Sequence, residues 1–195
     1  GGFGLEISML GIDHDKAPLA VREKFSLTKK QAAGCAARLR GLGAGGAVVL
    51  CTCNRMEFWY TGALRLTPQE LLRQFFGVEA EEYERFFAFR SGCQAVEHLF
   101  ALACGLKSQI FGEDQILTQV GQAAEAARSA GTTDSVLDRL FRDAVAAAKE
   151  VKSRLRLTHA SRPAAASMAA FCREQLGDLT GLRALVIGSG EMGRL

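Results

Sequence analysis

This 195-residue chain has only three prolines, and its formal net charge is small, at +3. A dedicated nucleic-acid-binding domain is usually more basic, so this charge permits an acidic partner without demanding one. Long hydrophobic runs are missing too, since none approaches the roughly 20 residues of a membrane-spanning helix. The opening GGFGLEISML lacks the basic start and apolar core of a secretory signal. We therefore expect a cytoplasmic protein with no membrane partner.

The six cysteines form no recognisable metal-binding or disulfide framework. There is one Cys-x-Cys pair, Cys51 and Cys53, no second pair, and only three histidines in the chain. This is too few ligands at the wrong spacing for a structural zinc site, so we expect no metal. In a reducing compartment the thiols should stay free, and most should act as small apolar core residues.

The first half of the chain predicts a compact mixed fold. Hydrophobic residues make up 48% of the chain and charged residues 23%, which is typical of a globular protein. Expected strands span 5–13, 47–53, 56–62 and 86–90, and expected helices span 17–25, 67–77 and the stretch from 28 to the glycines at 41–46. The order strand, helix, strand, strand, helix, strand indicates an α/β (α+β) fold of the ferredoxin-like, split βαβ kind.

The second half has a helical period instead. We expect a helical segment over 91–158 that ends in a long helix, followed by a connecting helix over 159–180. The domain division is therefore 1–158, made of a ferredoxin-like part (1–90) and the helical part, then the connecting helix, then the start of a Rossmann domain over 181–195.

A glycine motif follows the apolar strand at the end of the chain. The G-x-G-x-x-G pattern consists of Gly188, Ser189, Gly190, Glu191, Met192 and Gly193. Such a turn lets a backbone approach a dinucleotide pyrophosphate at a helix N-terminus. The pattern alone is weak, and an unrelated glycine-rich turn is the alternative, because the sequence stops two residues later.

Cys53 is the candidate nucleophile. It falls where the strand 47–53 gives way to a turn, and Arg55 supplies a fixed positive charge that could favour thiolate or bind a substrate carboxylate. On physical grounds a nucleophilic and an inert Cys53 are equally supported, whereas Cys51 is expected to be a buried strand residue.

Two further features are candidates for a site. A polar cluster surrounds the break at Gly112 and consists of Ser108, Glu113, Asp114, Gln115 and Gln119. Helix capping explains the acidic residues but not the glutamines. His98 lies in the middle of a helix, where a histidine is more often structural than catalytic.

Four stretches together resemble the glutamyl-tRNA reductase family: GIDHDKAPLAVREKFSL (11–27), TCNRMEFW (52–59), HLFALACGLKSQIFGEDQILTQVGQA (98–123) and LVIGSGEMG (185–193). They occur in order over nearly the whole chain. The Thr-Cys-Asn-Arg turn and the GEDQILTQV segment are specific to that family, whereas the glycine motif is not.

The resemblance implies a reaction and a role for each residue. Cys53 would attack the ester of glutamyl-tRNA(Glu) to form a thioester, which NADPH would reduce to glutamate-1-semialdehyde, the first step of five-carbon tetrapyrrole (porphyrin and haem) biosynthesis. His98 matches a histidine important for activity. Substrate contacts would come from Thr52, Asn54, Arg55, Ser108, Glu113, Asp114, Gln115 and Gln119, and NADPH contacts from Gly188, Ser189, Gly190, Glu191, Met192 and Gly193. The full-length family is homodimeric, and glutamate-1-semialdehyde aminomutase is an expected partner.

The sequence departs from the family pattern at three places. Cys51 stands where the family commonly has Ser, Asp114 replaces a common Pro, and SRPAAAS (161–167) replaces a glycine-containing stretch. We expect a truncated piece of the enzyme that retains the acyl-transfer half and lacks hydride transfer. The alternatives are a short non-catalytic paralogue that binds tRNA or the next pathway enzyme and, less well supported, another kind of NAD-dependent dehydrogenase.

Overall fold

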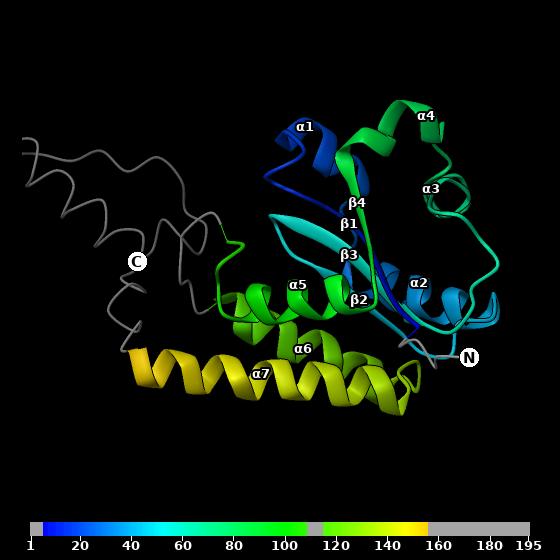
Figure 1. Cartoon of the computed structure of the whole chain (residues 1–195). Coiled ribbons are helices and arrows are strands. Elements are labelled where there is room, and N and C mark those ends of the chain that lie inside the picture. Colours follow the sequence, from blue (N-terminus) through cyan, green and yellow to red (C-terminus); the bar gives the residue numbers. More distant parts are fainter. Residues whose placement is uncertain (1–5, 109–114, 156–195) are drawn as a thin grey trace, which may run out of the picture.

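The computed structural model describes residues 6–108 and 115–155 (Figure 1). The predicted connecting helix and the glycine motif at 188–193 lie outside these residues. No helix in the two described ranges is long and apolar enough to cross a membrane.

Four strands form one antiparallel sheet in the order β2-β3-β1-β4. They are β1 (Ile7–Asp13), β2 (Ala47–Cys51), β3 (Arg55–Thr61) and β4 (Phe87–Ser91). β1 and β3 are the central strands, and β2 and β4 lie at the two edges of the sheet. This order is that of the ferredoxin-like split βαβ unit, and the predicted fold class is confirmed.

Local capping signals fix the two longer crossover helices. α2 (Lys29–Gly41) begins after Thr28 and α3 (Pro68–Phe76) after Thr67, and each threonine forms a capping box with the third helical residue. Gly77 ends α3 with a φ of 64°, a conformation that glycine adopts at no steric cost. Both helices therefore begin and end close to where the sequence predicts.

Several short helical elements complete the ferredoxin-like part of the chain. They are α1 (Leu19–Arg22), the 3₁₀ turns η1 (Glu23–Phe25) and η2 (Glu84–Phe86), and α4 (Ala80–Tyr83). The sequence did not predict α4 and η2, because one-turn elements carry too few residues for a periodic pattern.

The sheet is buried on both faces. One face packs Leu10, Ile12 and Phe58 against the crossover helices, and the other packs Ile7 and Trp59 against the helical segment. Because side chains alternate along a strand, Trp59 and its neighbour Phe58 enter different cores. The strands therefore look almost continuously apolar in sequence.

The helical segment forms the second layer. α5 (Cys93–Ala103), α6 (Gln115–Ser129) and α7 (Ser135–Leu155) lie together along one side of the sheet (Figure 1). All three contribute to the core around Trp59, whose ring meets Phe141 of α7 edge to face at 5.5 Å.

The loop between α6 and α7 fixes this layer to the sheet. The Ala47 N–H donates to the Thr132 carbonyl at 2.8 Å, and Asp134 accepts from the Leu137 N–H at 2.9 Å, which caps α7. Gly46 lies against this loop so closely that a Cβ there would come within 2.6 Å of the Asp134 backbone. Glycine is required at this position by close approach.

We expect G46A to lower the free energy of unfolding by about 1–3 kcal/mol, since the added methyl displaces the loop that caps α7. G34A is the matched control, because a Cβ at Gly34 in α2 meets nothing within 4 Å. It should raise stability by about 0.5–1 kcal/mol through helix propensity. Urea denaturation measures both changes, and equal stability of the two variants would contradict the packing described here.

Candidate functional site

The turn between β2 and β3 presents Cys53 to solvent. The Thr52 N–H donates to the Arg55 carbonyl at 2.8 Å, and the Asn54 N–H donates to Thr52 Oγ1 at 3.1 Å. The Asn54 carbonyl accepts from the His14 N–H at 3.0 Å, which fastens the turn to the end of β1. The exposed thiol of Cys53 is thus held on a rigid hairpin tip.

Arg55 begins β3, and its guanidinium is buried beneath this turn. The residue is 4% exposed. Its guanidinium donates to Glu57 Oε1 at 3.0 Å and to the Lys107 carbonyl at 2.6 Å, and Asp13 Oδ2 lies 3.6 Å away. An arginine carries five N–H donors, so at least two of them take no part in these contacts.

Glu57 is the centre of the buried polar network, and the sequence did not single it out. Besides Arg55, it accepts from Trp59 Nε1 at 3.0 Å and lies 2.8 Å from His98 Nε2. Gly11 on β1 lies opposite, and a Cβ there would come within 2.7 Å of Glu57 Cγ, so glycine leaves room for the carboxylate. The available signal was an acid sharing a strand face with Arg55 and Trp59.

The charge state of Glu57 follows from its partners. Burial by itself would raise the pKa of this carboxyl, but the hydrogen bond and charge of His98, followed by those of Arg55, outweigh it. The pKa of Glu57 therefore lies below its ordinary value, and the group is ionised at neutral pH.

His98 does not line a cavity with Cys53. It is 6% exposed on α5, stacks on Trp59 at 6.0 Å between ring centroids, and contacts Glu57. Its Nδ1 has no hydrogen-bond partner in the described ranges. Its connection to the turn runs through Glu57 and Arg55.

A small cavity joins the two sequence segments predicted to form the site. Its volume is about 20 Å³. It is lined by Thr52, Cys53, Asn54, Arg55, Ser108, Gln115, Ile116 and Gln119. Six of these are predicted substrate-binding residues and Cys53 is the predicted nucleophile, whereas the other two predicted substrate-binding residues, Glu113 and Asp114, lie outside the described residues. The described ranges contain no group of three or more His, Cys, Asp or Glu side chains that could hold a metal ion.

The neighbouring Cys51 has a different environment from Cys53. It is half-buried at the end of β2, packs against the core under α2, and its Sγ accepts from the Leu27 N–H at 3.3 Å. Burial raises the pKa of the Cys51 thiol and outweighs that hydrogen bond. Cys51 is therefore half-buried and protonated at neutral pH.

We expect E57Q to lower the free energy of unfolding by about 3 kcal/mol at pH 7, because it removes the charge that compensates buried Arg55. The pKa of Glu57 is lowered in the folded state, so its contribution is full above the ordinary glutamate pKa of about 4.3 and is lost as pH falls through the lowered value. The stability gap to the parent should close on acidification.

Urea denaturation from pH 7 down to pH 3 measures this gap. E97Q is the control, since Glu97 is exposed beside His98 on α5. A gap for E57Q that stays constant over this range would contradict the assignment of an ionised carboxylate.

Iodoacetamide at neutral pH should modify Cys53 well before Cys51, because only the first thiol is exposed and burial holds the second protonated. Peptide mass spectrometry over a time course measures the order. Cys93, the other exposed thiol in the described ranges, is the internal reference. Modification of Cys51 first would contradict the placement of the two thiols.

Comparisons with known proteins point to one family. The sequence family described as "Glutamyl-tRNAGlu reductase, N-terminal domain" matches residues 10–155. A glutamyl-tRNA reductase of Acetivibrio thermocellus is 42% identical over 194 residues, and one of Alkaliphilus oremlandii is 39% identical over 195. Each alignment covers 98% of this chain and 58% of the relative, so the chain spans somewhat more than half of their length.

A solved structure agrees with the sequence relatives. The glutamyl-tRNA reductase of Methanopyrus kandleri superposes with a TM-score of 0.69 at 30% identity, over 97% of this chain and 45% of that one. The hairpin with its exposed cysteine and the helical layer lie within the matched region. The chain therefore belongs to the glutamyl-tRNA reductase family and comprises its N-terminal domain.

Proposed function

We propose that this chain recognises the glutamyl group of glutamyl-tRNA(Glu) and accepts it on Cys53 as a thioester. The observation that carries the proposal is the cavity in which exposed Cys53 meets Arg55, Ser108 and Gln119. Membership of a family whose members are named glutamyl-tRNA reductase supports the substrate class.

The acyl transfer would proceed by addition and elimination. The Cys53 thiolate adds to the ester carbonyl, forming the S–C bond, and the C–O bond to the terminal ribose then breaks. The ribose oxygen leaves with a proton, so the thiol proton is balanced by the new hydroxyl of the tRNA.

Arg55 would also bind the glutamate side chain. Its unspent N–H groups match a carboxylate, whose charge complements the guanidinium. Gln115 and Gln119, which line the same cavity, would supply amide donors and acceptors. His98 would act as a positioning residue, because it reaches the turn only through Glu57 and Arg55.

Reduction of the thioester would follow the acyl transfer. NADPH, when bound, would supply the hydride, and the residues that the resemblance assigns to it, 188–193, lie outside the described residues. We also propose that the protein forms a homodimer and a complex with glutamate-1-semialdehyde aminomutase. In the absence of NADPH, we expect the thioester on Cys53 to hydrolyse slowly.

Incubation with radiolabelled glutamyl-tRNA tests the acyl transfer. The chain should acquire acid-precipitable label that hydroxylamine releases, and C53S should acquire none. C51S and C93S are the matched controls and should be labelled like the parent. Labelling of C53S at the parental rate would contradict the nucleophile assignment and favour a non-catalytic binding module.

A further inference from the structure

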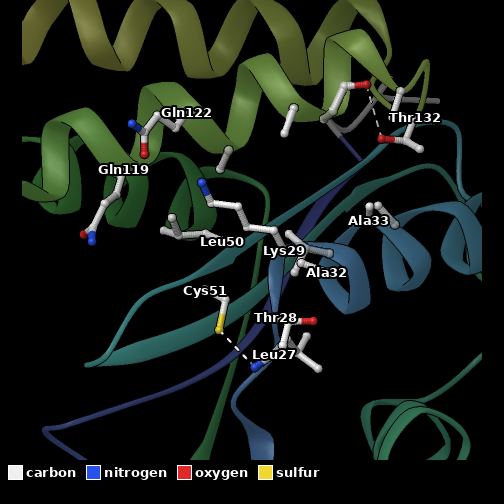
Figure 2. Close-up of a pocket in the computed structure, with 16 residues that line it drawn as sticks. Leu27, Thr28, Lys29, Ala32, Ala33, Leu50, Cys51, Gln119, Gln122 and Thr132 are labelled. Atoms are coloured by element: carbon white, nitrogen blue, oxygen red, sulfur yellow. Dashed lines mark hydrogen bonds between the residues drawn. The ribbon is translucent and has the colours of Figure 1, made fainter.

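A larger groove runs along the outer edge of β2, between α2 and α6 (Figure 2). Its volume is about 440 Å³, within the range of small-molecule sites. Alanines line both helical walls: Ala32, Ala33 and Ala36 on α2, and Ala123, Ala126, Ala127 and Ala130 on α6. Because alanine side chains are short, they leave room for a flat ring between the two helices.

The floor of the groove carries unpaired main-chain groups. β2 is an edge strand, and the Thr52–Arg55 and Thr61–Gly46 hydrogen bonds fix which of its residues face β3. By alternation, Val49 and Cys51 direct their N–H and C=O groups to the outer edge, as does Ala47, whose N–H is bonded to Thr132. Within the described residues, the N–H and C=O groups of Val49 and Cys51 on this edge have no hydrogen-bond partner, and neither does the Ala47 C=O, so they are open to a ligand.

These groups match the hydrogen-bonding edge of adenine. The Val49 C=O and the Cys51 N–H are an acceptor and a donor side by side on one strand edge. Adenine presents the complement, an exocyclic N6 donor next to the N1 acceptor. Unpaired bases at RNA ends are commonly read on this edge.

The groove lies next to the proposed acyl-transfer site. Gln119 lines both cavities, and Cys51 at the end of the groove precedes Cys53 by two residues, or about 7 Å of strand. A ribose joins adenine to the aminoacyl ester over a comparable span. Figure 2 shows Lys29 reaching across the groove from α2 toward α6, where its ammonium could meet a phosphate.

We propose that this groove binds the terminal adenosine of glutamyl-tRNA, with adenine paired to the edge of β2 and its 5′-phosphate near Lys29. The inference rests on the proposed function and deepens it by naming where the nucleoside lies. An added peptide strand fits less well, because Thr132 closes the edge at Ala47 and only two outward-facing residues remain.

Adenosine 5′-monophosphate is the probe for a binding test on the whole chain. We expect it to shift the backbone amide resonance of Cys51 and to bind about tenfold more tightly than inosine 5′-monophosphate, which has an acceptor in place of the N6 donor. A33F should abolish binding by filling the groove, and A37F, one turn along the same exposed helix face but outside the groove, should not.

Charge provides a second matched pair. K29A should weaken binding of the nucleotide severalfold, and K30A, whose lysine does not line the groove, should leave it unchanged. An unmoved Cys51 amide, equal affinity for the two nucleotides, or equal behaviour of A33F and A37F would overturn the proposal.

Acylation separates this inference from the proposed function. At a limiting concentration of glutamyl-tRNA, Cys53 of A33F should be labelled about tenfold more slowly than Cys53 of the parent. With a small glutamate ester that has no nucleoside, A33F should react like the parent. If A33F and the parent are labelled equally by glutamyl-tRNA, the groove assignment fails and acyl transfer stands. If Cys53 is never labelled, the proposed function fails, and nucleotide binding decides only whether the groove recognises adenosine.

Discussion

The guanidinium of Arg55, buried between the sheet and the helical layer, holds the parts of the site in one geometry. It connects the hairpin to Asp13 on β1, to the backbone after α5 through Lys107, and to His98 through Glu57. A buried cation must be compensated by a negative charge or hydrogen bonds, and removal of one partner leaves the cation unpaired in the low-dielectric interior. The turn that carries Cys53 therefore cannot shift without breaking a network that also positions α5.

Two cysteines of this hairpin are only two residues apart but lie in different environments. Cys51 is still part of β2, and its side chain belongs to the core under α2, where burial raises the pKa of its thiol. Cys53 lies past the last ladder pair and projects from the turn. The same edge strand leaves main-chain groups open beside α6, so the chemistry of the thiol and the recognition of a nucleoside would share one structural element.

Much of the fold could be predicted from the sequence, because the succession of strands and helices along the chain depends on local signals. The capping boxes at Thr28 and Thr67, which mark the starts of two helices, are examples. The pairing of the 52–55 turn with the 108–119 segment came from the family resemblance, since no local pattern encodes that contact. Glu57 was missed for a physical reason: a charged strand residue normally faces solvent, and its partner His98 is 41 residues away. The single-turn α4 was too short to predict.

The proposed function depends on Cys53 forming a covalent bond to the glutamyl group above the Arg55 network. Peptide-mapping mass spectrometry of the chain, quenched in acid after mixing with glutamyl-tRNA, tests this most directly. We predict a mass increase of one glutamyl group on the peptide that contains Cys53, within the residues of the turn. A glutamyl group found on another side chain, or an unmodified Cys53 while glutamyl-tRNA is consumed, would contradict it.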